Sequence, residues 1–144
     1  MPTSPSAADP AAIRTLALVG GGAAGKTTLA EALLHRAGMI GAAGSVERGS
    51  TVSDFDPLER QAQHSLNSAL LHLNHRGTRI HLIDTPGSPD FIGPALTALE
   101  AVETAAIVID AAAGVDPVAR RLMDTAARRG LCRVVIVNKI DAQG

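Results

Sequence analysis

The sequence predicts an α/β fold in three layers, with a mostly parallel sheet that has one antiparallel strand at its edge. Short apolar runs rich in Val, Ile and Leu alternate along the chain with segments whose apolar residues recur at helical spacing. Strands that alternate with helices are typical of a sheet covered by helices on both faces. Only Arg76-Gly77 separates two of the strand-like runs, which predicts a hairpin and therefore one antiparallel pair.

The predicted elements follow one another without an internal repeat. The predicted strands are Ile13–Val19, Leu66–His75 with one wet face, Arg79–Ile83, Ala105–Ile109 and Arg133–Val137. The first predicted helix follows the glycine-rich segment and ends at Arg36. The second spans Asp90–Val102, with Pro94 in its first turn or at a bend, and the third spans Pro117–Arg129 and is followed by Gly130. The last strand is a continuous apolar run, which is typical of a parallel strand buried on both faces.

Two segments fall outside this alternation. Residues 1–12 are rich in Pro, Ala and Ser, which predicts a disordered N-terminal arm and a domain that spans residues 13–144. Glycines, Pro57 and scattered charges punctuate Gly38–His64, and a loop of this length inside a compact domain is either functional or mobile. We expect residues 39–65 to be the least ordered internal region when no ligand is bound.

Composition narrows the class of protein. The net charge is −1, so the chain has no general attraction to nucleic acid, and we expect no direct DNA binding. No apolar run is long enough to span a membrane, and no secretory signal is visible. The single cysteine excludes an internal disulfide and suits a reducing compartment, so we expect a cytoplasmic protein without membrane contact.

The segment after the first predicted strand fits the pattern G-x-x-x-x-G-K-[ST], a loop that binds phosphate. The residues that we expect to contact phosphate are Gly20, Gly21, Gly22, Ala23, Ala24, Gly25, Lys26, Thr27 and Thr28. Glycines let backbone N–H groups turn inward onto phosphate oxygens, and the following helix adds its positive N-terminal end. Lys26 is expected to reach the β- and γ-phosphates, and Thr27 to hold Mg²⁺.

The alternative is a glycine-rich turn that binds nothing. Of the 13 Lys plus Arg residues only Lys26 and Lys139 are lysines, so lysine is kept where a compact ammonium on a flexible stem has a use. Because the glycine pattern also lies between a predicted strand and a predicted helix, we favour a phosphate site.

Two more polar segments follow predicted strands. These residues are Asp84, Thr85, Pro86 and Gly87, and then Asn138, Lys139, Ile140 and Asp141. In such sheets ligands bind beyond the carboxyl ends of the strands. Asp84 is suited to hold Mg²⁺ through water, and the Gly87 N–H to contact a γ-phosphate. Asp141 can accept two hydrogen bonds from guanine that adenine cannot supply, so the predicted ligands are GTP or GDP with Mg²⁺.

From Ile13 to Asp141 the sequence resembles the first part of the GTP-binding domain of the translational GTPases, and it is most similar to elongation factor G and its paralogues. The resemblance runs without a gap from Asp54 and includes Asp84 to Gly87, Asp90-Phe91, Gly114-Val115 and Asn138 to Asp141. It implies a P-loop NTPase fold, a base site in which Asn138 supports the loop and the Lys139 stem covers the base, and GTP hydrolysis by the full-length protein on the ribosome.

The departures from the family pattern concern catalysis. The family usually carries A-H-x-D-A-G-K-T, whereas this chain has Gly20, Gly21, Gly22 and Ala23 at the first four positions. The family R-G-I-T segment, whose Thr binds Mg²⁺, aligns with Ala62-Gln63-His64-Ser65, so Ser65 is the expected third metal ligand. The family also carries D-T-P-G-H, whose His orients the attacking water, and Ser88 replaces that His.

The predicted catalytic residues are therefore Lys26, Gly87 and Ser88, with His64 as an alternative to Ser88. Two functions stay open: a GTPase that drives a translation step, or a GTP-binding paralogue that hydrolyses poorly and acts as a nucleotide-state switch. A third reading, a domain with decayed motifs and no ligand, is the least favoured. The family domain continues beyond the last residue here, so we also expect a C-terminally truncated domain.

Overall fold

The computed structural model describes residues 9–53, 58, 61 and 65–141, and it contains one five-stranded sheet in the order β2-β3-β1-β4-β5. Four strands are parallel, and β2 pairs antiparallel with β3 at one edge. The predicted sheet, mostly parallel with one antiparallel edge strand, is confirmed. The strands are β1 (Ile13–Gly20), β2 (Ala69–His75), β3 (Thr78–Asp84), β4 (Thr104–Asp110) and β5 (Cys132–Asn138).

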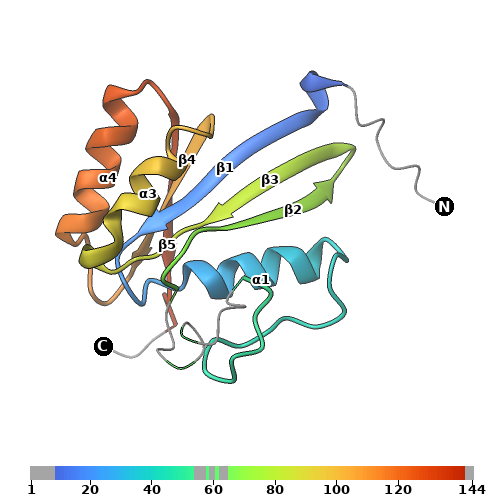
Figure 1. Ribbon diagram of the computed structural model, residues 1–144, viewed down its shortest axis with the longest axis horizontal. Helices are drawn as coiled ribbons and strands as arrows, with labels where there is room; N and C mark the ends of the chain where they lie inside the picture. Colours follow the sequence, from blue (N-terminus) through green and yellow to red (C-terminus); the bar gives the residue numbers. More distant parts are fainter. Residues whose placement is uncertain (1–8, 54–57, 59–60, 62–64, 142–144) are drawn as a thin grey trace.

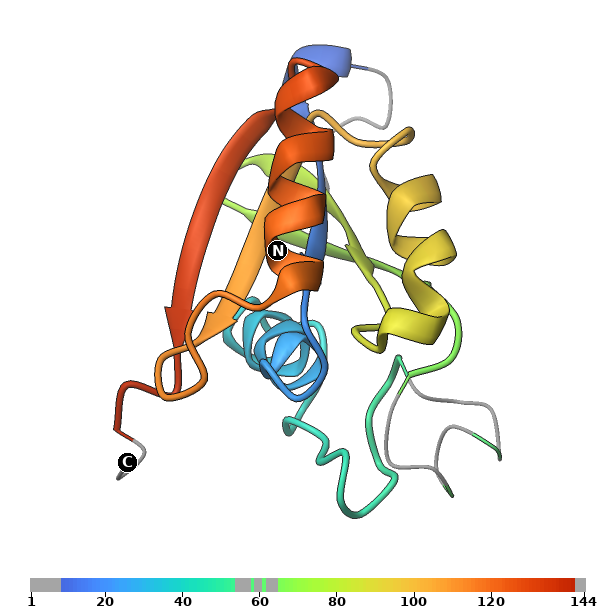
Figure 2. The same ribbon diagram turned by 90° about the vertical axis from the view of Figure 1, so that its left-hand side faces the viewer.

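Helices cover both faces of the sheet, as Figures 1 and 2 show. Helix α1 (Lys26–Arg36) lies on one face, and α3 (Ile92–Ala98) and α4 (Pro117–Arg128) lie on the other. Alternation along β1 explains the two cores. Val19 packs with residues of α3 and α4, whereas Leu18 packs with residues of α1. The three-layer arrangement is therefore built by side chains that point alternately to opposite faces.

Strand β2 has the wet face that its loose alternation predicts. Ala69, Leu71 and Leu73 are buried, whereas Leu70 is 69% exposed. The strand begins at Ala69 rather than at Leu66, because its register with β3 ends at the pair Ala69 and Asp84.

The helix predicted over Asp90–Val102 is shorter than expected. A 3-10 turn over Pro89–Phe91 precedes α3, and α3 ends at Ala98 with Pro94 in its first turn. The N–H groups of Glu100 and Ala101 bond to carbonyls three residues earlier, which tightens the chain out of the α-helix. Leu99 and Val102 still belong to the core. The apolar spacing therefore predicted the buried positions correctly, but it predicted too long a helix.

The prediction that the last strand is buried on both faces is wrong. Strand β5 lies at the edge of the sheet, and Val134, Val135 and Val137 are 48%, 48% and 56% exposed. Its partner β4 is covered, with Ile107 and Val108 both buried. Within the described residues no strand pairs with the outer side of β5, and this position explains the exposure of its valines.

The ends and the long loop add smaller differences. Pro10–Ala12 forms a 3-10 turn capped by Asp9, while residues 1–8 and 142–144 lie outside the described residues. The division into an arm and a domain stays a prediction. Leu58 and Gln61 are helical within the segment that was predicted as loop, and the rest of residues 54–64 lie outside the described residues.

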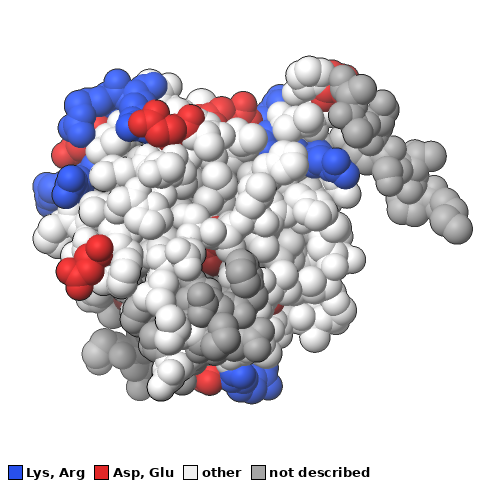
Figure 3. Space-filling model, in the orientation of Figure 1, with Lys and Arg blue, Asp and Glu red and all other residues white. Residues whose placement is uncertain are grey.

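Charges are sparse over the face that Figure 3 shows, and Lys and Arg gather at its rim, over the end of α4. Arg128 and Arg129 are exposed there. None of the described helices has the length and apolarity needed to cross a membrane.

Leu122 is fully buried between α4 and the sheet, so Leu122→Ala removes contacts that nothing replaces. We expect this substitution to lower the free energy of unfolding by about 2–5 kcal/mol. Leu70→Ala, at an exposed position, is the matched control and is expected to change it by less than about 0.5 kcal/mol. Urea unfolding followed by circular dichroism compares the two variants, and equal losses would contradict the assignment of the core.

Candidate functional site

The three polar segments predicted from sequence meet at one edge of the sheet. They follow β1, β3 and β5, and these parallel strands all end on the same side. A cavity of about 650 Å³ opens there. Its walls are formed by Gly22, Ala23, Gly25, Lys26, Thr27, Thr28, Val46, Glu47, Ser65, Thr85, Gly87, Ser88, Pro89 and Lys139.

The glycine-rich loop places the start of α1 at this cavity. Gly25 has φ +92°, and α1 begins at the next residue, so the helix N-terminus faces the cavity. A side chain at position 25 would collide with the amide of Asn138, so only glycine fits between the two loops. Ala23 also has a left-handed φ of 59°. The family pattern has Asp at this position, and Asp tolerates that conformation better than Ala.

Lys26 is held inside the loop that carries it. Its ammonium donates to the carbonyl oxygens of Gly20 at 3.1 Å and Gly21 at 2.7 Å, and the residue is 6% exposed. Burial lowers the pKa of Lys26, and the carboxylates of Asp84 and Asp116 oppose that shift. The two carbonyl contacts hold the Lys26 ammonium in one position at the cavity wall.

The three predicted metal ligands lie together. The Thr27 hydroxyl donates to Asp84 Oδ2 at 2.7 Å and lies 3.3 Å from Ser65 Oγ. Hydroxyl and carboxylate oxygens are the donors that Mg²⁺ prefers, and Mg²⁺ usually takes few protein ligands when substrate phosphates complete its shell. The described residues hold no cluster of three His, Cys, Asp or Glu side chains suited to a metal.

The segment after β3 is packed against the glycine-rich loop. Thr85 is buried and its hydroxyl donates to the Leu18 carbonyl at 2.7 Å, which fixes this segment to β1. A side chain at Gly87 would collide with the Lys26 ammonium and the Gly21 carbonyl. Pro86 is fully buried beside them. Ser88 is half-buried and lines the cavity, whereas the alternative His64 lies outside the described residues.

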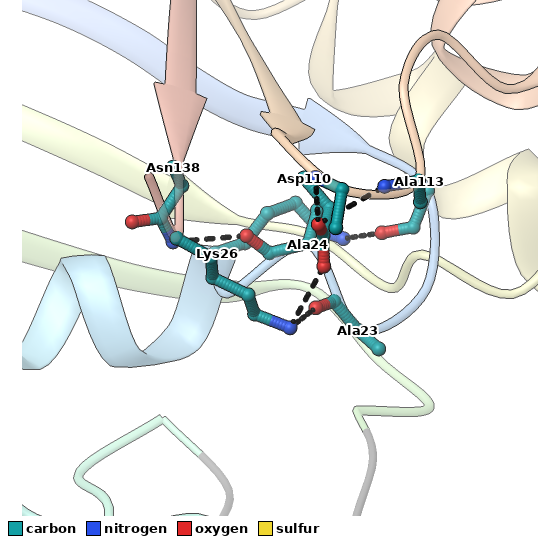
Figure 4. A network of polar contacts seen from close by, with 9 residues as sticks. Ala23, Ala24, Lys26, Asp110, Ala113 and Asn138 are labelled. Atoms are coloured by element: carbon teal, nitrogen blue, oxygen red, sulfur yellow. Dashed lines mark hydrogen bonds and ion pairs between the residues drawn. The ribbon is translucent and has the colours of Figure 1, made fainter. Parts of the chain in front are cut away.

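The segment after β5 also contacts the glycine-rich loop. Asn138 donates its amide to the Ala24 carbonyl at 3.0 Å, as Figure 4 shows. The Lys139 ammonium contacts the Ala23 carbonyl and lies 3.1 Å from Asp110 Oδ2. The hydrogen bond from Lys139 to Asp110 lowers the pKa of that carboxyl group. The backbone N–H groups of Ala112 and Ala113 also donate to Asp110 and lower its pKa further. Asn138 thus joins the segment after β5 to the glycine-rich loop.

Asp141 is not brought into the cavity. It is exposed, it is the last residue that the structure describes, and it is absent from the cavity wall. The role of Asp141 as the reader of the base therefore stays a prediction.

Sequence reasoning missed two acidic residues of the site, Asp110 and Asp116. Asp116 caps α4, because its Oδ1 accepts a hydrogen bond from the Ala119 N–H at 2.7 Å. Its Oδ2 lies against Gly21, where it occupies the space that a Cβ would need. The Asp116-Pro117 pair at the start of α4 is a helix-start signal that could have revealed the cap. Its contact with Gly21 joins residues far apart in sequence, so no local pattern reveals it.

Comparison with known proteins decides the family. Residues 11–144 match the family described as the elongation factor Tu GTP binding domain. The chain belongs to this family.

Several relatives within this family are long proteins. The chain is 40% identical over 138 residues to an elongation factor G-like protein of Mycobacterium tuberculosis, covering 96% of this chain and 19% of that protein. It is 45% identical over 121 residues to an oxytetracycline resistance protein of Streptomyces rimosus, covering 84% and 18%. The chain thus spans about a fifth of the length of these relatives, and the resemblance to elongation factor G is confirmed.

A solved structure of a protein from Thermus thermophilus has the same fold. It superposes with a TM-score of 0.89 at 42% identity, over 93% of this chain and 20% of that one. The P-loop fold predicted from the sequence is confirmed by this match.

The burial of Lys26 predicts a pH dependence of stability. Because its pKa is lowered in the folded protein, the unfolded chain binds more protons between that lowered pKa and the ordinary value of 10.5. The contribution of Lys26 to the free energy of unfolding should therefore increase as pH rises through this window. The sequence has no tyrosine to titrate in the same range.

Urea unfolding of the wild type and of Lys26→Met, at several alkaline pH values, measures this contribution. We expect the difference in free energy of unfolding, wild type minus variant, to increase with pH. A difference that stays constant or decreases would show that the folded protein does not disfavour the charged form of Lys26.

Proposed function

We propose that this chain binds GTP and that, within a longer protein, it hydrolyses GTP to GDP and phosphate to drive a translation step on the ribosome. The observation that carries the proposal is the meeting of Lys26, the Thr27–Asp84 pair and the Asn138 loop around one cavity. Membership of an elongation factor family supports the ribosome as partner. A cytoplasmic location belongs to the same proposal, because translation factors act where ribosomes are.

The phosphates would bind at the N-terminus of α1. Backbone N–H groups of residues 22–28 would donate to phosphate oxygens, and the Lys26 ammonium would exchange its contacts with Gly20 and Gly21 for contacts with the β- and γ-phosphates. Thr85 would keep the turn after β3 in place through its hydrogen bond to the Leu18 carbonyl of β1, while Gly87 of that turn lies against Gly21 and Lys26.

Hydrolysis would proceed by in-line attack of water on the γ-phosphorus, with cleavage of its bond to the β–γ bridging oxygen. Lys26 and the Gly87 N–H would stabilise the negative charge that develops on the phosphoryl oxygens. Thr27, Ser65 and Asp84 would hold Mg²⁺, which when bound neutralises charge on the β- and γ-phosphates. Ser88 would be the nearest side chain of the turn to the attacking water.

The guanine base would lie beyond the glycine-rich loop. Asn138 would keep the loops together, the stem of Lys139 would cover one face of the base, and Asp141 would accept hydrogen bonds from the guanine N1–H and exocyclic amine. Lys139 is already fixed by Ala23 and Asp110, which supports a stem held in one position.

The second candidate function is a GTP-binding switch that hydrolyses slowly. Ser88 favours it, because a serine hydroxyl is short and neutral where the family has an imidazole that orients water. The retained Lys26, Thr27 and Asp84 favour hydrolysis. Turnover of the full-length protein with and without ribosomes distinguishes the two functions.

The base site predicts an exchange of specificity. Asp141→Asn should weaken GTP binding and improve binding of xanthosine triphosphate, because xanthine has a carbonyl where guanine has an amine. Competition between the two nucleotides, measured on the full-length protein by calorimetry, should reverse in order. Lys26→Ala is the second arm and should abolish binding of both. A preference for GTP that is unchanged in Asp141→Asn would exclude Asp141 as base reader, and unchanged affinity in Lys26→Ala would refute the whole site.

The replacement of histidine by Ser88 predicts slow turnover. Groups that position water or transfer its proton contribute typically about 10²–10⁴-fold in rate, or roughly 3–5 kcal/mol of barrier. We therefore expect the full-length protein, at saturating GTP with ribosomes, to turn over slowly compared with relatives that carry the histidine. Ser88→Ala should change kcat little, and Ser88→His should raise it where the loop accepts the side chain.

The control for this rate measurement is His64→Ala. A large loss with His64→Ala and none with Ser88→Ala would assign the role to His64. A collapse of kcat in Ser88→Ala would show that the serine itself is catalytic and would contradict the prediction of a small effect.

A further inference from the structure

Helix α1 carries a buried carboxylate that the proposed chemistry does not use. Glu31 is 1% exposed and belongs to the same helix as Lys26 and Thr27. No ion pair joins Glu31 to a basic side chain within the part of the chain that the structure describes. A carboxylate buried without a counter-ion is costly unless hydrogen bonds satisfy its oxygens.

Both oxygens of Glu31 are satisfied by the backbone of one loop. Oε2 accepts from the Gly44 N–H at 2.7 Å, and Oε1 accepts from the Val52 N–H at 2.5 Å. One carboxylate therefore holds the two ends of the segment 44–52, here called the clamped loop. A glutamine could accept only one of these two bonds, because its amide nitrogen donates.

The clamped loop is also closed on itself. The Ser50 N–H bonds to the Ser45 carbonyl at 3.1 Å, and the Gly49 N–H bonds to the Val46 carbonyl at 3.0 Å. At Gly44 a side chain would collide with the backbone at Ser50. The loop is thus a compact turn, and Glu31 fixes its ends to α1.

The tip of the clamped loop reaches the proposed nucleotide site. Val46 and Glu47 line the same cavity as Lys26 and Thr28. One rigid helix therefore carries the phosphate-binding residues at its start and, at Glu31, the attachment of the opposite wall. Two hydrogen bonds to this single side chain hold the two ends of that wall.

We propose that Glu31 is a positioning residue for nucleotide binding, which acts by holding the clamped loop as a wall of the nucleotide cavity. The proposal rests on the proposed function, since it concerns the same cavity. Glu31 is buried against the loop and contacts its backbone, so it acts through Val46 and Glu47 rather than by touching the nucleotide.

The test uses Glu31→Gln, Glu31→Ala and the control Asp124→Asn, which changes an exposed carboxylate on α4. In the full-length protein we expect Kd for a fluorescent GDP analogue to increase by about tenfold in Glu31→Ala, with a smaller increase in Glu31→Gln. KM for GTP should increase with kcat unchanged, because Lys26 and Asp84 are intact. Asp124→Asn should behave as the wild type.

A second measurement follows the loop directly. Arg48 is exposed in the clamped loop, so trypsin cleavage after Arg48 reports release of the loop, and cleavage after the exposed Arg120 of α4 reports general unfolding. We expect cleavage after Arg48 to accelerate in both Glu31 variants, without nucleotide, while cleavage after Arg120 keeps its wild-type rate.

The outcomes separate the possible failures. Wild-type values of Kd and of Arg48 cleavage in both Glu31 variants would overturn the inference. Equal acceleration at Arg48 and Arg120, with a lower thermal midpoint and an unchanged KM, would also overturn it, because Glu31 would then only stabilise the fold. If Glu31→Ala does not fold, Glu31→Gln decides. A wild type that binds no guanine nucleotide would instead refute the proposed function.

Discussion

The structure around the cavity depends on one buried ammonium. Lys26 has its charge among carbonyl oxygens of its own loop, with the carboxylates of Asp84 and Asp116 near enough to oppose the cost of burial. The carbonyl dipoles around the ammonium are already oriented toward it, and they lower the free-energy cost of burying its charge. In the proposed function, contacts with phosphate oxygens would offset the cost of burying this ammonium.

The fixed dipoles require three loops to approach within contact distance, and small residues make this possible. Gly87 lies against the Lys26 ammonium, and Gly25 lies against the amide of Asn138. Neither position has room for a Cβ. Thr85 then bonds the turn after β3 to β1. The loops around the cavity are thus joined by close backbone contacts and not by aromatic packing, which this chain almost lacks.

Helix α1 contributes to two sides of the cavity. Its N-terminus presents Lys26 and Thr27, and Glu31 fixes the clamped loop. The cavity therefore has one side formed by the loops at the strand ends and another formed by the clamped loop, whose two ends bond to one carboxylate.

The sequence by itself determined the layers, the order of elements and the three polar segments. Apolar periodicity and the spacing around Lys26 are local signals, and local signals suffice where burial and helix formation agree. The sequence also indicated that Thr27, Asp84 and Ser65 belong together. Only tertiary structure decided the rest. The Asp116 contact with Gly21, the double bond of Glu31 to its loop and the exposure of β5 all depend on which distant segment lies alongside. No regular spacing in the sequence predicts such contacts, because the number of residues between the two partners follows no rule.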